Sequence, residues 1–263
     1  MKLIVVLALL LALFCAVGAT SPMTTYQADR RIAEIAAGSA CARHFWKDRG
    51  RAPVGYIKGV AQVYAKSFCE SRGSSETPAR VMNQPLQGNQ DALVHYRDAL
   101  RRNGIDVNSD IERLRALFTL GIGLGMRESS GNTTEGRDTN VRHPTASNAE
   151  AGLFQQSFDS LDRRIPALAQ LLEQYRANTG ACDLETFKEG IPRVITRPVV
   201  GTGPGADFQR FTRECPAFAT EYATVLLRVN RGHFGPINRQ EAEFFQPCND
   251  MLREVEAVAT CTP

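Results

Sequence analysis

Residues 109–128 read SDIERLRALFTLGIGLGMRE and carry the best-marked helix signal in the chain. Ser109 and Glu112 form an S-x-x-E capping box, which is typical of a helix N-terminus. The apolar run from Ala116 to Met126 that follows predicts burial of this helix. It is interrupted by three glycines, each of which costs up to about 1 kcal/mol relative to alanine: Gly121, Gly123 and Gly125. They indicate either close packing against another helix or space left beside a bound molecule.

Glu128 stands at the end of this apolar helix, just before the turn-forming stretch Ser129–Gly131. On a helix it shares a face with Leu124 and Gly125. Because an apolar setting disfavours the charged form of a carboxylate, we expect a raised pKa for Glu128. A carboxylic acid that keeps its proton near neutral pH can protonate a leaving oxygen, which cleavage of a glycosidic bond requires. The alternative is a solvent-exposed glutamate at a helix end.

A second motif, G-L-F-Q, spans Gly152 to Gln155 and follows Glu128 after a polar segment. The ordered pair of E-S-S at a helix end and G-L-F-Q downstream resembles the lysozyme-like superfamily. Within it, lytic transglycosylases and goose-type lysozymes carry E-S and then G-L-M-Q. The resemblance covers residues 126–157 of the 263, and Phe154 stands where these families usually have methionine.

The resemblance implies a lysozyme-like fold and a sugar-binding site. Glu128 corresponds to the general acid, and the substrate would be peptidoglycan or a related aminosugar polymer. A later A-x-Y-N-x-G stretch of the family is matched only loosely by residues 224–232, which lack the tyrosine. Substrate contacts are therefore expected from the matching positions and from one tyrosine nearby: Ser129, Gly152, Phe154, Gln155 and Tyr222.

The segment between the motifs holds three further acids, Glu135, Asp138 and Glu150. An inverting hydrolase needs a second carboxylate about 6.5–9.5 Å from the acid to activate water, and we expect Glu135 or Glu150 in that role. Asp138 is expected to contact substrate. A lytic transglycosylase needs no second carboxylate, since the 6-hydroxyl of the substrate attacks. The acids favour hydrolysis, and they leave open a preference for deacetylated, chitosan-like glucosamine polymers.

Helical periodicity in the rest of the chain predicts a mainly α fold (α+β), with a small polar loop or β-hairpin inserted at 131–150. Loops are expected at 73–90 and 191–206, because these stretches are rich in turn-forming residues. The other predicted helices are 26–37, 54–70, 90–102, 165–175, 207–230 as one helix or two, and 239–258, broken at Pro247.

The chain begins with Lys2 and an apolar run, Leu3–Val17, followed by small residues. This pattern predicts a signal peptide at residues 1–19, with one catalytic domain over 20–263 and a secreted or periplasmic location. The run is shorter than the ~20 residues that span a bilayer, so no stable membrane insertion is expected, although an uncleaved N-terminal anchor is the alternative.

Six cysteines remain beyond the signal peptide, an even number that favours disulfides in an exported protein. Six cysteines allow 15 pairings, and spacing does not decide between them. The pairing expected from their order in the chain is Cys41–Cys69, Cys182–Cys215 and Cys248–Cys261.

Several other classes of function are disfavoured by the sequence. A net charge of +3 is too weak to indicate nucleic-acid binding, and no C-x-x-C or H-x-x-x-H spacing indicates a metal. The glycines of GIGLG fall late in a helix, whereas a phosphate-binding loop needs its glycines at the start of a helix. R-E-S-S-G lacks the first glycine of a serine-nucleophile elbow. We expect a monomer without cofactors; a catalytically inactive, secreted glycan-binding module is the non-enzyme alternative.

Overall fold

The computed structural model describes residues 24–72, 78–136, 142–161, 164–191 and 198–261. The predicted signal peptide and Asp138 lie outside these ranges. The described chain is mainly helical, as predicted, and the lysozyme-like arrangement stays a prediction. Its helices and strands are α1 (Thr25–Gly38), α2 (Ala40–Arg43), β1 (Phe45–Trp46), β2 (Gly50–Arg51), α3 (Val54–Ser71), α4 (Pro78–Asn83), α5 (Ala92–His95), α6 (Arg97–Arg102), α7 (Asp110–Ser129), η1 (Phe158–Ser160), α8 (Pro166–Ala177), η2 (Thr179–Cys182), α9 (Leu184–Lys188), α10 (Pro204–Glu214), α11 (Pro216–Val229), η3 (Arg231–His233), α12 (Gly235–Asn238) and α13 (Gln246–Glu256).

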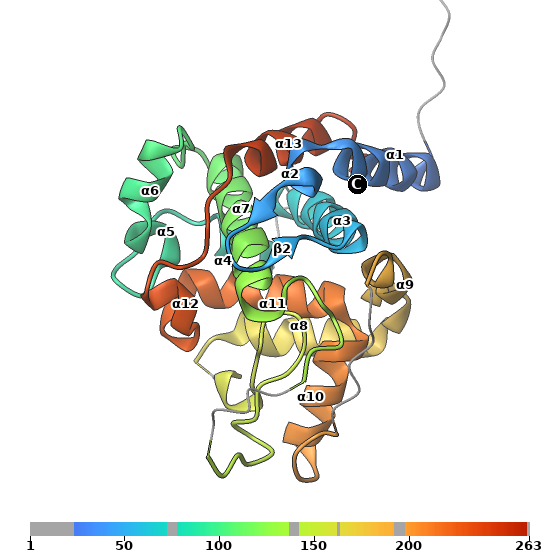
Figure 1. Cartoon of the computed structure of the whole chain (residues 1–263), viewed down its shortest axis with the longest axis vertical. Helices are drawn as coiled ribbons and strands as arrows, with labels where there is room; N and C mark the ends of the chain where they lie inside the picture. Colours follow the sequence, from blue (N-terminus) through green and yellow to red (C-terminus); the bar gives the residue numbers. More distant parts are fainter. Residues whose placement is uncertain (1–23, 73–77, 137–141, 162–163, 192–197, 262–263) are drawn as a thin grey trace, which may run out of the picture.

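Helix α7 lies in the middle of the molecule and packs against α13, α4, α3 and α11 (Figure 1). It begins at the predicted capping box, in which the Ser109 hydroxyl accepts from the Glu112 N–H and the Glu112 carboxylate accepts from the Ser109 N–H. Every residue from Arg113 to Met126 is buried. Burial on all sides is typical of a helix inside a core, so α7 is the element around which the others pack.

Two of the three α7 glycines are sites of close packing. A Cβ atom on Gly123 would lie 2.2 Å from the carbonyl oxygen of Glu243, and one on Gly125 would lie 2.3 Å from the Tyr56 hydroxyl oxygen. That hydroxyl donates to the carbonyl oxygens of Gly121 and Ile122, at 3.2 and 2.9 Å. Of the two interpretations open from the sequence, close packing therefore holds at Gly123 and Gly125.

The sheet does not lie in the segment where the sequence predicted a possible hairpin. Among the described residues, the sheet pairs β1 with β2 in antiparallel register, and neither 131–136 nor 142–150 forms a strand. Asp48 in the connecting turn and Gly50 at the start of β2 adopt positive φ. Near the start of the polar segment, the Asn132 side-chain oxygen accepts from the N–H and hydroxyl of Thr134. Such local side-chain bonds compete with strand pairing.

Three disulfides are present, but two of the three predicted pairings are wrong. The bonds are Cys41–Cys248, Cys69–Cys261 and Cys182–Cys215, of which only the last was predicted. Helix α13 packs against α2 and α3. Packing of α13 against α2 brings Cys248 to Cys41, with 4.7 Å between their Cα atoms, so pairing follows the contacts between helices and not the order of cysteines in the chain.

Helix boundaries differ from prediction mainly at prolines and at short helices. The segment 90–102 divides into α5 and α6 at Tyr96, and 207–230 divides into α10 and α11 at Cys215. Cys215 has φ −128° and ψ 71°, because a residue before proline is driven out of the helical region. Pro247 lies in the first turn of α13 rather than inside it, and α4 falls within the predicted loop 73–90. No helix in the described ranges is both long and apolar enough to traverse a bilayer.

Candidate functional site

Glu128 is the penultimate residue of α7. The helix stops because Ser130 adopts the left-handed conformation, at φ 56° and ψ 30°, and Gly131 follows at φ 75°. The N–H groups of Ser130 and Gly131 then donate to the carbonyls of Met126 and Gly125, at 3.0 and 3.2 Å. This termination satisfies carbonyls that the helix end would otherwise leave open. It fixes the backbone on the C-terminal side of Glu128, whose side chain is half-buried.

Ser129 joins the end of α7 to the G-L-F-Q segment. Its buried hydroxyl donates to the carbonyl oxygen of Leu153 at 2.8 Å and lies 3.1 Å from that of Gly125. The same oxygen accepts from the N–H of Asn132 at 3.1 Å. The two motifs singled out in the sequence are therefore in direct contact, and the contact runs through the residue next to Glu128.

The G-L-F-Q segment is a tight turn closed by a bridge between Ala151 and Gln156. Gly152 has φ 77°, and a Cβ atom there would lie 2.9 Å from the Thr212 carbonyl oxygen, so the turn requires glycine. Gln155 also has positive φ, at 49°. Its side-chain amide donates to the carbonyls of Gly136 and Gly152, at 2.9 and 3.0 Å. In this structure Gln155 thus holds the turn together.

Phe154 and Tyr222 lie in the core, which corrects their expected role as substrate contacts. Both side chains have no solvent-accessible surface. The Phe154 ring packs over Gly125, and the Tyr222 hydroxyl lies 3.0 Å from that of Ser160. Burial raises the pKa of Tyr222 above its ordinary value, so the phenol stays neutral. Neither aromatic side chain exposes surface to a ligand.

Glu135 is attached to the same turn as Ser129, because its backbone carbonyl accepts from the Gly152 N–H at 2.9 Å. Its half-buried carboxylate accepts from the N–H of Gly136 at 3.2 Å. Glu150 is half-buried as well and precedes the bridge residue Ala151. Of the three acids between the motifs, Glu135 is thus hydrogen-bonded to the G-L-F-Q turn, and Asp138 lies outside the described residues.

A group of charges beside Glu128 comes from far along the chain. Arg127 pairs with Glu241 at 3.4 Å, and Arg239 pairs with Glu241 at 2.8 Å. The hydrogen bonds that Arg239 donates to Glu241, together with the charges of Glu241 and Glu128, raise the pKa of Arg239. Arg239 thus lies close enough to Glu128 for their opposite charges to attract, although exposure of Arg239 to solvent screens this attraction.

His233, which the sequence did not single out, lies beside the G-L-F-Q turn. Burial lowers its pKa below 6.5, while the Asp159 charge and a hydrogen bond to the Gln155 backbone raise it. In the described part of the chain, its Nε2 atom is buried without a hydrogen-bond partner. The imidazole is therefore held neutral at the back of the turn.

This burial makes stability depend on pH. Below pH 6.5 the unfolded chain binds a proton at His233 that the folded chain resists, so lowering the pH through 6.5 lowers the free energy of unfolding. The loss approaches at most about 1.4 kcal/mol per pH unit. Denaturant titrations of wild type and His233→Gln, run from about pH 8 to about pH 5, should show a steeper decline in wild type. Parallel curves would contradict the burial of a neutral imidazole.

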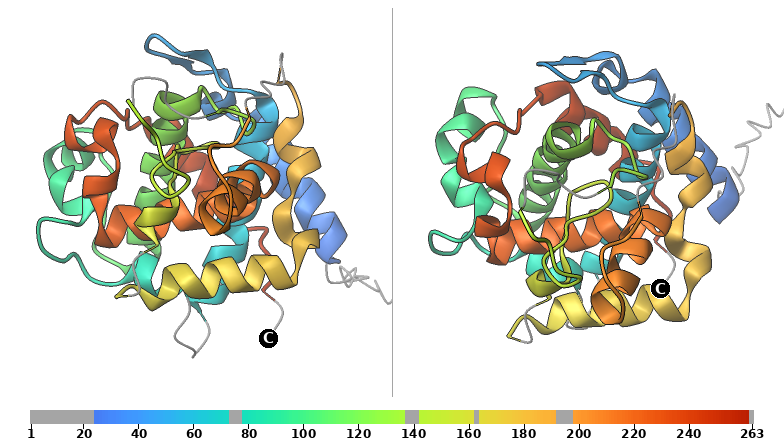
Figure 2. Two further views of the ribbon diagram at one scale, coloured as in Figure 1. Left: turned by 90° about the horizontal axis from the view of Figure 1, so that it is seen from below. Right: turned by 60° about the horizontal axis from the view of Figure 1, so that its bottom comes forward.

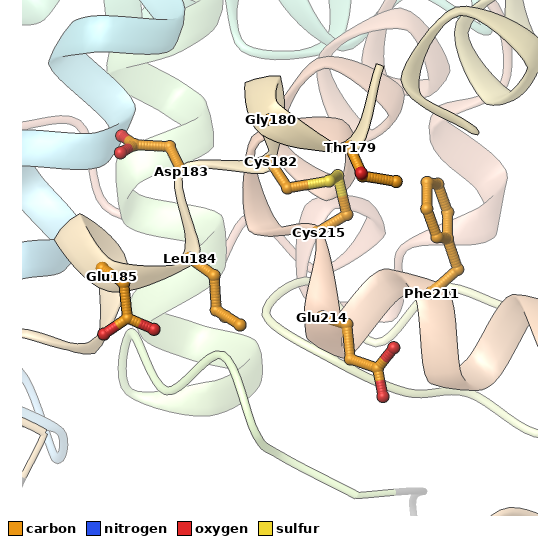
Figure 3. A pocket seen from close by; sticks show the side chains of 9 residues that line it. All are labelled: Thr179, Gly180, Cys182, Asp183, Leu184, Glu185, Phe211, Glu214 and Cys215. Atoms are coloured by element: carbon orange, nitrogen blue, oxygen red, sulfur yellow. A yellow bond between two sulfur atoms is a disulfide. The ribbon is translucent and has the colours of Figure 1, made fainter. Parts of the chain in front are cut away.

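A separate pocket of about 450 Å³ lies beside the Cys182–Cys215 disulfide. Figure 3 shows Glu185 and Glu214 on opposite sides of it with Leu184 between them, and the Asp183 carboxylate directed away from the disulfide. None of the candidate site residues lines this pocket. Within the described ranges, no group of three or more His, Cys, Asp or Glu side chains could hold a metal ion.

Comparisons with protein-family models, with curated proteins and with solved structures yield no match for this chain. The functional interpretation therefore depends on the geometry around Glu128.

Proposed function

We propose that this protein is a glycoside hydrolase of the lysozyme-like type that cleaves β-1,4 bonds of peptidoglycan, with Glu128 as its general acid. One contact carries the proposal: the Ser129 hydroxyl donates to Leu153 at 2.8 Å and ties the helix-end glutamate to the G-L-F-Q turn. A chance co-occurrence of the two motifs gives no reason for them to touch. Their contact is what a shared site requires.

The chemistry assigned to Glu128 is proton donation to the glycosidic oxygen. The C1–O bond breaks, its electron pair goes to the leaving oxygen, and positive charge develops at C1. A water molecule then attacks C1 and gives its proton to a second carboxylate. We assign that role to Glu135, because the hydrogen bond between its carbonyl and the Gly152 N–H attaches its backbone to the same turn. Glu150 is the alternative base.

Ser129, Gly152 and Gln155 act in this proposal as positioning residues. Ser129 and Gln155 are buried and use their polar atoms within the protein. Gly152 allows the turn its positive φ. They fix the turn relative to α7, and so fix the place of any substrate relative to Glu128. Small misplacements of reacting groups are costly in enzymes, which gives a rigid support of this kind a catalytic value.

A location outside the cytoplasm is part of the proposal. Three disulfides are typical of proteins from oxidising compartments, and cell-wall polymer is found there. A monomer that meets its substrate in the medium or the periplasm fits both observations.

Product analysis tests the reaction type. Purified cell walls are treated with the protein, and the soluble fragments are analysed by mass spectrometry. Hydrolysis is expected to give fragments with reducing ends. Anhydro ends, lighter by one water, would identify a lytic transglycosylase and remove the need for Glu135. Parallel digestion of acetylated and deacetylated walls would show which polymer is preferred. Release of no fragments from either wall would contradict the proposed enzyme.

A further inference from the structure

The hairpin β1–β2 and its flanks, residues 43–51, read RHFWKDRGR and form the basic hairpin. Its four cations, Arg43, Lys47, Arg49 and Arg51, stand against one acid, Asp48, and leave a net charge of +3. This equals the formal net charge of the whole 263-residue chain. All five charged residues are exposed. The nine residues of the basic hairpin therefore carry a net charge equal to that of the whole chain, so positive charge is concentrated there.

The cations of the hairpin are not neutralised by the rest of the protein. Within the part of the chain that the structure describes, Lys47, Arg49 and Arg51 form no ion pair, and Arg43 donates to the backbone carbonyl of Gly38. An acid from far along the chain, Glu243, contacts the His44 ring and the backbone N–H of Lys47 instead of a cationic side chain. The positive charge thus faces outward.

The same hairpin exposes a large apolar ring. Phe45 is 70% exposed, and the described chain has one other large apolar side chain as open to solvent, Tyr26 at 76%. Phe45 pairs with Arg51 across the strands, so a phenyl ring and a guanidinium are neighbours on one face. Exposure of an aromatic ring to water is unfavourable. An exposed ring beside several cations therefore indicates a surface that contacts a partner.

The base of the hairpin is firmly held. Trp46 points to the opposite face from Phe45 and is buried. The His44 ring stacks on Phe245 with 3.8 Å between ring centroids, and the Lys47 N–H donates to the Glu243 carboxylate at 2.9 Å. Phe45 and its neighbouring cations are therefore displayed from a fixed base, which reduces the entropy that a partner must remove on binding.

We propose that the basic hairpin docks the protein on a membrane surface rich in anionic phospholipid. Lys47, Arg49 and Arg51 would lie among the phosphate groups while Phe45 enters the boundary with the acyl chains. Cations beside aromatic or apolar side chains are the combination that binds such interfaces. The contact is peripheral and leaves the fold outside the bilayer.

The shape of the site favours a lipid surface over a chain-like ligand. In both views of Figure 2 the hairpin, in blue, stands out at the edge of the molecule. A peptide or glycan chain is bound along a groove that surrounds it, whereas a sheet of headgroups is met by a protruding tip. Membrane docking is independent of whether Glu128 is catalytic, since none of the hairpin residues belongs to the candidate site.

Vesicle co-sedimentation of the full chain tests the proposal. Vesicles of equal parts phosphatidylglycerol and phosphatidylcholine are compared with vesicles of phosphatidylcholine alone. Wild type is expected to prefer the anionic vesicles, and to lose that preference in high salt. The double variant Lys47→Gln/Arg49→Gln should lower the partition coefficient about 25-fold, from roughly fivefold per cation. Phe45→Ser should lower it about tenfold.

Two matched controls separate the hairpin from exposed side chains in general. Tyr26→Ser removes the other exposed aromatic ring, and Arg101→Gln/Arg102→Gln removes two exposed cations from α6; both should bind as wild type does. Equal binding to the two vesicle types would overturn the proposal. A Phe45→Ser variant that binds anionic vesicles as well as wild type does would also overturn it, because the hairpin would then recognise negative charge alone. In that case soluble dextran sulfate, a polyanion without a lipid surface, should bind wild type and the variant equally.

Discussion

Glu128→Gln is expected to reduce the rate of wall cleavage by about 10²–10⁴-fold, the usual contribution of a general acid. Glutamine has the same shape but cannot give up a proton, so the glycosidic oxygen must leave as an anion. The reduction corresponds to about 3–5 kcal/mol in the activation barrier. Turbidity loss of purified walls under saturating substrate measures it.

The fold should not suffer from this substitution. Glu128 is half-buried at the C-terminal end of α7, where a negative charge is unfavourable by about 0.3–1 kcal/mol because of the helix dipole. Glu128→Gln removes both this unfavourable interaction and the attraction to Arg239, so its unfolding temperature should change little. Glu214→Gln is the matched control, since Glu214 is an exposed glutamate at the C-terminal end of α10; it should retain full activity. An active Glu128→Gln enzyme would remove the basis of the proposed function.

Asp91→Ala is expected to lower the free energy of unfolding by about 3–5 kcal/mol, since it leaves a buried cation without its partner. The Asp91 carboxylate and the Arg228 guanidinium lie 2.7 Å apart, and both side chains are fully buried. Burial lowers the pKa of Arg228, and the charge of Asp91 offsets only part of this lowering. Arg228 also donates to the carbonyls of Gln84 and Pro85, so the pair fastens the loop before α5 to α11.

Urea or guanidinium titrations with the disulfides intact measure this loss. The double variant Asp91→Ala/Arg228→Met should be more stable than Asp91→Ala alone, because it no longer buries an unpaired charge. Asp98→Ala removes the acid of the Asp98–Arg101 pair, whose side chains are 77% and 74% exposed, and should cost less than about 1 kcal/mol. An Asp91→Ala loss as small as that of the control would show that the buried pair contributes nothing.

The sequence predicts best what depends on neighbouring residues. Helix α7 begins at its capping box and ends at the Ser130–Gly131 turn. Both ends are expected from Ser109 and Glu112 and from the apolar run that follows them. Helices α1, α3 and α8 also lie within a residue or two of their predicted ends. In each case the spacing of apolar side chains and the local hydrogen bonds at the ends decide the structure.

Burial of aromatic residues could not be predicted from the same patterns. The sequence positions of Phe154 and Tyr222 fit either a cleft wall or a core. Their burial follows from tertiary contacts, with Gly125 for Phe154 and with Ser160 for Tyr222. Arg239 and His233 reach the site from the last third of the chain, and no local motif marks them. Their positions depend on how α11 and the segments after it fold back along α7.

The polar segment between the motifs shows a third limit. Turn-forming residues there are compatible with a hairpin or with a loop. The hydrogen bonds that the Asn132 side chain accepts from Thr134 favour a turn. The observed hairpin is too short for a periodic signal, because each of its strands has two residues. Its place is set by the burial of Trp46 beneath it.

The two long-range disulfides also constrain the order of oxidation during synthesis. In the proposed exported chain, Cys41 and Cys69 would reach an oxidising compartment before Cys248 and Cys261, their partners 207 and 192 residues later. An oxidant that acts on cysteines as they emerge would join Cys41 to Cys69, which the folded chain forbids. Under the proposed export, efficient production would depend on thiol–disulfide exchange to undo that early bond, and a host with strong oxidase but weak isomerase activity should accumulate the mispaired chain.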